Sequence, residues 1–590
     1  MSATEHRKTA RICWVFAISL AVMAITQLFA YRFDYYMQDA VSYLDMADHF
    51  KQGDFASGFT AYWSPLYPLV IAVVTSIVRL PPYWEPAQLH MTNLVVLIFV
   101  LFCFRAFLSS FLIFYARSFR KSQSVFARIP RHLWMLLLCS LFLYYFPALT
   151  GIETDTPDLL AHGLLFLAMS RALAIQAGSN KTKDFVILGI TLGVAYYAKS
   201  VMFPLSLFLY VSLLLRNTLG RLPKLIMALA ITTLISLPLM VAVSRAEGAV
   251  TFSPTAKLNY YWMVQQGLTP PHATGDDEER QHLLHPTRKI FSQPDAYEFR
   301  YEQSCTYPPH FDPSYWYRGA RVQLMPDRLL SVYSLNMIAL IELFIAPLAM
   351  LCVFLAFIYK RKYLTTDSVL FNAPLFLISL VTCFGTPLAV FIIFEHTNRY
   401  FQSACLLIVV GFFSSLRLNA TEIGNKALRW TTILMCIFCI GNAIVREVGD
   451  VVKALSPASY PYAEVMKDLQ AAGLHGGDNV ARLGDKEMEV WARQCRLHIV
   501  ADIPEPTQFW SATPERRAAL IDELKKYNVK ALVYFSQGVS YSQSDLDGHY
   551  FQRLKQLGLK KGSSPEPEPE FMIKEGWKKI DDLHGYYLPL

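Results

Sequence analysis

Acidic residues gather in two short segments whose spacing could support catalysis. In DAVSYLDMADHF, Asp39 and Tyr43 stand four residues apart, which would place both on one face of a short helix. In GIETDTPD, Glu153, Asp155 and Asp158 form a tight turn before an apolar run. A carboxylate in such a position can serve as a general base, although acids that open a helix also suit the helix dipole.

Cationic residues occur in two further segments. Lys199 lies in YYAKS, near the far end of an apolar run, and the turn EHTNRY presents His396, Arg399 and Tyr400. Lysine and arginine can clamp a phosphate through charge-assisted hydrogen bonds. The acids and cations together suit a site for an amphiphile with an anionic head, in which a carboxylate acts on the group attached to the phosphate.

The composition indicates which elements position these residues. Of the 590 residues, 54% are hydrophobic and only 17% are charged, against about 25% charged in soluble proteins. Apolar runs recur that are long enough to cross a hydrocarbon layer of about 30 Å. We therefore predict a polytopic α-helical membrane protein of the cell (inner) membrane and exclude a single soluble core.

Apolar length and charge predict about eleven transmembrane helices. They lie near residues 12–31, 87–115, 133–150, 158–176, 185–202, 204–215, 224–243, 331–358, 369–394, 400–416 and 428–446. Lys and Arg gather in alternate connecting segments, so the positive-inside rule places the N-terminus in the cytoplasm and residues 447–590 outside it.

The predicted domains follow from this topology. Residues 1–446 form the membrane domain, and residues 32–86 are its first outer loop. In this loop the apolar stretch 64–82 is expected to be an interfacial or re-entrant helix. Residues 244–330 form a large outer loop rich in aromatic residues. In residues 447–590 the apolar segments shorten and alternate between strand-like and helical patterns, which predicts a small extracytoplasmic α/β domain.

The net charge of +8 could suggest a nucleic-acid partner. Basic residues beside membrane spans are better explained by topology, and we expect membrane lipids and no nucleic acid as partners. A multi-span transporter or flippase of lipid-linked or anionic substrates, and a non-enzymatic envelope assembly protein, remain alternatives. A transporter is expected to carry its ionisable residues near mid-bilayer, whereas here they gather at one face.

The motifs, taken in order, resemble a known superfamily. The chain resembles the GT-C glycosyltransferases that use polyprenyl-phosphate sugars. The motifs that carry the resemblance are D-x-x-x-Y, G-D, S-P-L-Y-P, an acidic second loop, Y-Y-A-K-S and a late R-Y turn. The similarity is to the branch of the protein O-mannosyltransferases and lipid A aminoarabinose transferases, and it covers roughly residues 1–446. It implies inverting transfer of a sugar from a polyprenyl-phosphate donor to an extracytoplasmic acceptor, which would be an envelope lipid, a glycan or a protein.

The resemblance also implies roles for individual residues. Asp39 matches the catalytic carboxylate, and Asp158 matches the second-loop acid, with Glu153 and Asp155 as alternatives. No cofactor is required by this mechanism; a divalent cation held by Asp39 and Asp158 is possible, as in oligosaccharyl relatives.

The remaining matches concern the donor phosphate. Lys199 matches the family's lysine that contacts it, and Arg399 and Tyr400 match the late outer turn. We expect Arg399 to bind the phosphate together with Lys199, and Tyr43, His396 and Tyr400 to support the site.

Overall fold

The computed structural model describes most of the chain. It covers residues 3–35, 38–119, 126–149, 151–215, 219–265, 282–338, 340–341, 366–390, 398–418, 420–457, 461–484, 489–535, 569–580 and 585–590. The chain divides into two compact units. We call Met1–Arg32, His90–Ala242 and Tyr333–Pro457 the helical unit, and Phe33–Leu89, Val243–Val332 and Ala458–Leu590 the sheet unit.

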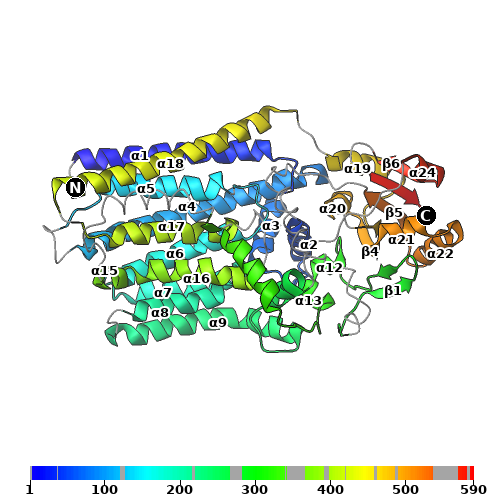
Figure 1. The fold of residues 1–590 in the computed structure, drawn as a ribbon, viewed down its shortest axis with the longest axis horizontal. Helices are drawn as coiled ribbons and strands as arrows, with labels where there is room; N and C mark the ends of the chain where they lie inside the picture. Colours follow the sequence, from blue (N-terminus) through cyan, green and yellow to red (C-terminus); the bar gives the residue numbers. More distant parts are fainter. Residues whose placement is uncertain are drawn as a thin grey trace. The chain divides into compact units, whose positions relative to one another are not determined.

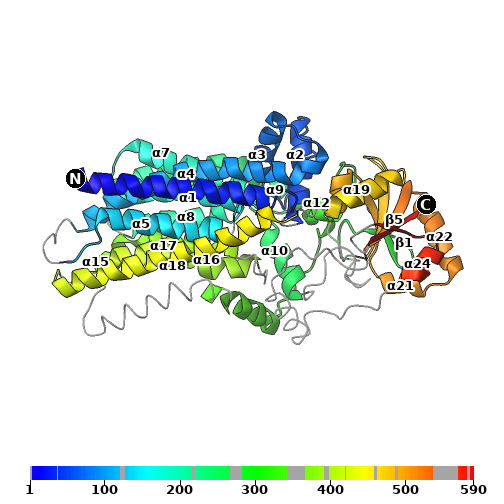
Figure 2. The same ribbon diagram turned by 90° about the horizontal axis from the view of Figure 1, so that it is seen from above.

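The helical unit is built from long helices that lie side by side with nearly parallel axes (Figures 1 and 2). They are α1 (Ala3–Ala30), α4 (Glu85–Ser118), α5 (Arg131–Leu143), α6 (Asp158–Gln176), α7 (Thr182–Ala198), α8 (Met202–Leu214), α9 (Leu222–Glu247), α15 (Thr366–Phe371), α16 (Ala373–Val390), α17 (Asn398–Ser415) and α18 (Glu422–Leu455). The first residues of α4 and the last residues of α9 belong to the sheet unit.

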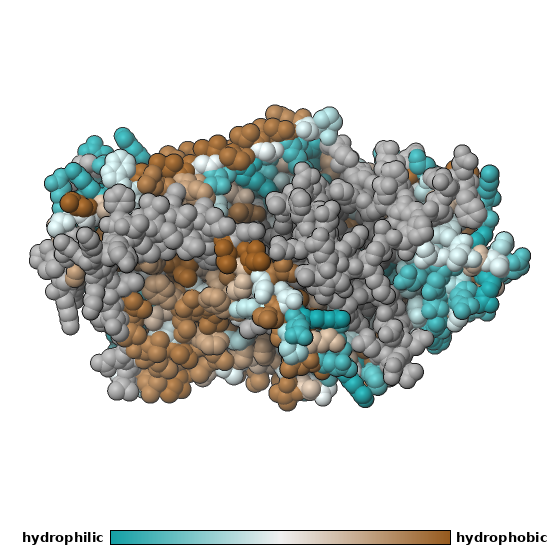
Figure 3. All heavy atoms as spheres, in the orientation of Figure 1, coloured by the Kyte–Doolittle hydropathy of each residue, from teal (hydrophilic) through white to brown (hydrophobic). Residues whose placement is uncertain are grey.

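Five helices among the described residues are long and apolar enough to cross a membrane. They are Arg7–Ala30, Pro82–Ser118, Asp158–Gln176, Leu222–Glu247 and Glu422–Leu455. Apolar side chains such as Ile226, Leu234 and Trp430 are exposed on the surface of these helices, where Figure 3 shows broad hydrophobic areas. Such a surface is favourable in lipid and costly in water, so the chain is a membrane protein.

The helices agree closely with several predicted spans. The predicted span 158–176 is α6 to the residue. The predicted spans 185–202 and 204–215 overlap α7 and α8, and α8, with 13 residues, is one of the shorter apolar helices. Residues 342–358 of the predicted span 331–358 lie outside the described residues, and the total of about eleven spans stays a prediction.

The apolar stretch 64–82 contains α3 (Leu66–Ile77), a helix of 12 residues. At 1.5 Å per residue it extends about 18 Å, which is too short to cross a hydrocarbon core of about 30 Å. It packs against α2 (Asp39–Lys51) inside the sheet unit. This length fits the interfacial helix that the sequence predicts.

The sheet unit contains one mixed sheet of seven strands in the order β1-β2-β4-β3-β5-β7-β6. The strands are β1 (Arg288–Phe291), β2 (Ala296–Glu298), β3 (Asn479–Leu483), β4 (His498–Ile503), β5 (Val529–Phe535), β6 (Lys578–Ile580) and β7 (Gly585–Pro589). Strands β4, β3 and β5 are parallel and form the centre, and the other pairings are antiparallel. Because β2 pairs with β4, the aromatic segment 244–330 and the C-terminal segment share one sheet.

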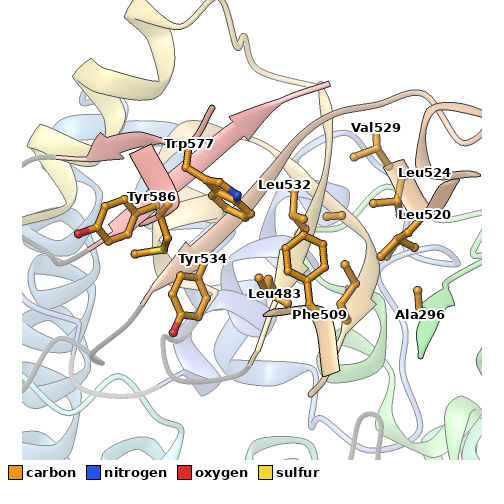
Figure 4. Packing of buried hydrophobic residues seen from close by; sticks show 14 residues of the cluster. Ala296, Leu483, Phe509, Leu520, Leu524, Val529, Leu532, Tyr534, Trp577 and Tyr586 are labelled. Atoms are coloured by element: carbon orange, nitrogen blue, oxygen red, sulfur yellow. The ribbon is translucent and has the colours of Figure 1, made fainter. Parts of the chain in front are cut away.

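Short helices accompany the sheet. They are α10 (Thr255–Tyr260), α12 (Pro308–Phe311), α13 (Pro313–Trp316), α19 (Pro461–Ala471), α20 (Val490–Cys495), α21 (Pro506–Ser511), α22 (Pro514–Lys525) and α24 (Pro569–Lys574). Phe509, Leu520, Leu532 and Trp577 pack with other buried side chains in the hydrophobic core of the sheet (Figure 4).

A buried arginine ties α2 to the C-terminal part of the sheet unit. The guanidinium of Arg493, on α20, lies 2.7 Å from carboxylate oxygens of Asp45 and Asp48 on α2 and of Glu85 at the start of α4. Arg496 pairs with Glu85 at 2.8 Å from a more exposed position. Since unpaired buried charges are costly, these pairs fix α2 against α20.

We expect replacement of Arg493 by methionine to destabilise the sheet unit. Removing one partner of a buried ion pair costs about 3–5 kcal/mol. The buried Asp45 would lose its arginine partner, and Glu85 would keep only Arg496. Urea unfolding of the purified protein, followed by tryptophan fluorescence, should show the loss. Arg496→Met is the control and should be milder because Arg496 is partly hydrated; equal stability of Arg493→Met and the wild type would contradict the expectation.

Candidate active site

Asp158 lies at the centre of a polar cluster in the helical unit. It is the first residue of α6, directly after Pro157, and its side chain is buried. One carboxylate oxygen pairs with Lys199 Nζ, and the other lies 3.4 Å from Arg399 Nε. Thr156 Oγ1 donates a hydrogen bond of 2.8 Å to that second oxygen. A single carboxylate therefore organises two cations.

Lys199 stands where the chain breaks between α7 and α8. It has extended backbone angles and caps the C-terminal end of α7, where the helix dipole favours a cation. Its Nζ lies 3.9 Å from the centroid of the Tyr400 ring, a distance suited to a cation–π contact. With 23% of its side chain exposed, Lys199 is the more accessible of the two cations; Arg399 is 5% exposed.

Arg399 occupies the beginning of α17, where the helix dipole disfavours a cation. The carboxylate of Asp158 compensates for this position, and the guanidinium donates a hydrogen bond of 2.9 Å to the Tyr400 hydroxyl. Tyr400 thus contacts both cations, through its ring and through its oxygen.

His162 is a member of the cluster that the sequence analysis missed. Its ring contacts Ser403 Oγ at 2.8 Å and the backbone oxygen of Arg399 at 2.7 Å, so it anchors the start of α17 to α6. A signal was present in the sequence, because His162 follows Asp158 by four residues and so shares its helix face.

The charges of the cluster favour an anion. One carboxylate and two cations give a net charge of about +1 at neutral pH. The carboxylate of Asp158 is already engaged by Lys199, Arg399 and Thr156, so it does not fit a divalent cation. In the part of the chain that the structure describes, no three His, Cys, Asp or Glu side chains gather into a metal site.

The two alternative second-loop acids make separate pairs. Glu153 lies 2.8 Å from Arg446 of α18, and Asp155 lies 3.3 Å from His90 Nδ1 of α4. Both acids are buried. Glu153 and Asp155 therefore connect helices through these pairs. Of the three second-loop acids, Asp158 is the one that pairs with Lys199 and Arg399, the predicted phosphate ligands.

Asp39 belongs to the sheet unit and is the first residue of α2. One of its oxygens lies 3.9 Å from His310 Nε2. Tyr43, one turn along the helix, is buried and packs edge-on against the rings of Trp63 and Tyr67. The helix that the Asp39–Tyr43 spacing predicts is therefore present. The catalytic role of Asp39 stays a prediction. His396 lies outside the described residues.

Comparisons with known proteins give matches among solved structures alone. No protein-family model and no curated protein matches the chain. The crystal structure of ArnT from Cupriavidus metallidurans bound to undecaprenyl phosphate is similar over 98% of both chains, with 13% sequence identity and a TM-score of 0.41. The archaeal oligosaccharyltransferase AglB from Archaeoglobus fulgidus, in complex with an inhibitory peptide and a dolichol-phosphate, is similar over 88% of this chain and 69% of its own, with 10% identity and a TM-score of 0.41.

Identities of 10–13% with TM-scores near 0.41 describe a likeness and do not establish membership of a family.

We expect Asp158→Asn to destabilise the helical unit, because Lys199 and Arg399 would then repel each other without a carboxylate between them. Breaking such a buried pair costs about 3–5 kcal/mol. Adding Lys199→Met to Asp158→Asn should recover part of the loss, since one cation is then removed from the cluster. Thermal unfolding of the two single variants and the double variant in detergent measures this coupling. Strictly additive losses would show that the contact between Asp158 and Lys199 contributes nothing.

Proposed function

We propose that this protein is a membrane glycosyltransferase that moves a sugar from a polyprenyl-phosphate donor to an acceptor on the outer face of the cell membrane. The observation that carries the proposal is the cluster of Asp158, Lys199 and Arg399. It offers a net positive, partly accessible site at the ends of apolar helices. A phosphate joined to a lipid tail matches both properties, because the charge suits the phosphate and the apolar helices suit the tail.

The chemistry of the donor explains why two cations are useful. When the bond between the anomeric carbon and the phosphate oxygen breaks, its electron pair moves to the phosphate, which gains negative charge. Lys199 and Arg399 would stabilise that charge more strongly in the transition state than in the bound donor. A site near lipid strengthens the effect, since electrostatic attraction increases as the local dielectric constant falls.

Asp39 is the proposed catalytic carboxylate. An acceptor hydroxyl or amine attacks the anomeric carbon from the side opposite the phosphate, and its proton passes to Asp39. The new bond forms as the bond to phosphate breaks, so the anomeric configuration inverts. Phosphate is a good leaving group, and the mechanism needs no general acid.

The proposed side of the membrane follows from the donor. With the N-terminus in the cytoplasm, the acids and cations of the site face outward, where nucleotide sugars are scarce and a lipid must carry the activated sugar. The placement of Asp158, Lys199 and Arg399 at helix ends favours this function over a transporter, for which ionisable groups near mid-bilayer are expected.

The phosphate site is tested by neutralising each cation. We expect Lys199→Met and Arg399→Gln each to weaken binding of polyprenyl phosphate by about tenfold or more, because a hydrogen bond to a charged group contributes about 1.5–3 kcal/mol. Binding to the purified full-length protein can be measured by intrinsic fluorescence or by competition with a labelled lipid phosphate.

Arg171→Gln is the matched control for these variants. Arg171 lies on the same helix α6, 13 positions after Asp158, and pairs with Asp184 at 3.0 Å. The substitution Arg171→Gln therefore removes an ion pair from the helical unit at a point about 20 Å along the helix from the proposed site. Equal affinity for polyprenyl phosphate in the wild type and in both the Lys199 and Arg399 variants would remove these residues from the site.

The catalytic carboxylate is tested by Asp39→Asn. General-base catalysis contributes about 10²- to 10⁴-fold, so turnover should fall on that scale while binding of polyprenyl phosphate stays the same. The assay follows release of polyprenyl phosphate from mannosyl, glucosyl and aminoarabinosyl donors, and uses the donor that the wild type consumes. Asp54→Asn, an exposed acid of the same loop, is the control and should retain turnover. Full activity of Asp39→Asn would refute the assignment.

A further inference from the structure

His310 is placed beside Asp39 by the aromatic segment of the sheet unit. It lies in α12 (Pro308–Phe311), which packs against α2. Its Nε2 is 3.9 Å from Asp39 Oδ1, and the two side chains are 17% and 23% exposed. This distance is longer than a hydrogen bond, and a shift of about 1 Å would close it.

Three hydrogen bonds fix the orientation of His310. Its backbone oxygen accepts one bond from Ser42 Oγ and one from Trp63 Nε1, each of 3.0 Å. Its ring Nδ1 lies 3.2 Å from the same Ser42 Oγ. Ser42 is three residues after Asp39 on α2, so one turn of helix carries both the carboxylate and the group that holds the histidine.

The hydrogen bonds of Ser42 are compatible with a neutral ring that carries its proton on Nδ1. The hydroxyl of Ser42 has one hydrogen, which it donates to the backbone oxygen of His310, so its oxygen can accept a hydrogen from Nδ1. In the tautomer with its proton on Nδ1, Nε2 has no hydrogen and can take up a proton. Nε2 lies 3.9 Å from Asp39 Oδ1.

From this geometry we infer that His310 acts through Asp39, by accepting the proton that Asp39 takes from the acceptor. The inference deepens the proposed function and rests on the catalytic role of Asp39. In the transfer, the acceptor O–H or N–H proton passes to Asp39 and then to His310 Nε2, while the electron pair of the broken sugar–oxygen bond leaves with the lipid phosphate. Asp39 returns to its ionised form, and the imidazolium releases the proton to solvent.

The test compares two replacements of His310. His310→Ala removes the ring, and His310→Gln keeps a polar side chain that can hydrogen-bond but cannot take up a proton. We expect both to lower kcat by about tenfold or more, within the range of acid–base contributions, with unchanged KM for the donor that the wild type consumes. A purely structural role would be rescued by glutamine, so wild-type kcat in His310→Gln would overturn the relay.

A double-mutant cycle separates this inference from the proposed function. In an Asp39→Asn chain, His310→Gln should cause no further loss, because the relay acts only through Asp39. A full additional loss would overturn the relay. If Asp39→Asn itself kept wild-type turnover, the proposed function would fail; if it lost turnover while both His310 variants kept theirs, the relay alone would fail.

His49→Ala is the matched control. His49 also lies on α2 and also joins it to the aromatic segment, through a contact of 2.8 Å between Nε2 and the backbone oxygen of Ser304. It is ten positions from Asp39, about 15 Å along the helix. We expect His49→Ala to retain kcat while lowering the unfolding temperature as much as the His310 variants do. A loss of kcat in His49→Ala equal to that in His310→Gln would overturn the relay. The loss in His310→Gln would then be explained by the loss of any contact that holds α2 in place.

Discussion

The pairing of Asp158 with Lys199 and Arg399 is the constraint on which the helical unit depends. Charged groups at the ends of apolar helices are costly unless they have partners, and here one carboxylate meets two cations from separate helices. The end of α7 and the beginning of α17 are thereby fixed to the beginning of α6. His162 adds a second connection between α6 and α17, so the cations are held by a scaffold and not by flexible side chains alone.

The same physical rule organises the sheet unit, in which segments far apart in the sequence come together. In addition to the ion pairs of Arg493, the buried Arg482 of β3 forms a bidentate ion pair with Asp502 of β4, with hydrogen bonds of 3.0 and 2.9 Å. Tyr307, from the aromatic segment, donates a hydrogen bond of 2.6 Å to the same carboxylate. Burial raises the pKa of Asp502, although Arg482 acts in the opposite direction. These contacts fix α12, and therefore His310, relative to the sheet.

Local patterns in the sequence predicted the local structure well. The apolar run that starts at Asp158 appears where the pattern places it, because helix ends depend on nearby residues. The break between α7 and α8 lies at residues 199–201, a few residues before the break that the predicted spans 185–202 and 204–215 place at residue 203. The spacing of Asp39 and Tyr43 likewise predicted α2. Pairings across the chain were not predictable, because Arg446 with Glu153 and Asp39 with His310 are separated by hundreds of positions. A single sequence carries no periodic signal for such contacts, and the pairing of β2 with β4 was missed for the same reason.

The net charge of the cluster of Asp158, Lys199 and Arg399 bears on how a transferase of the proposed kind would complete its cycle. Two cations alone would give +2 and would hold the lipid phosphate product, which is more negative than the donor, very strongly. Asp158 lowers the charge to about +1 at neutral pH. An interaction that stabilises both the transition state and the bound product does not raise turnover if it slows release of the lipid phosphate. In the proposed transferase, a carboxylate between the two cations would therefore serve two requirements at once, since it holds them in place in an apolar environment and would weaken their binding of the departing phosphate.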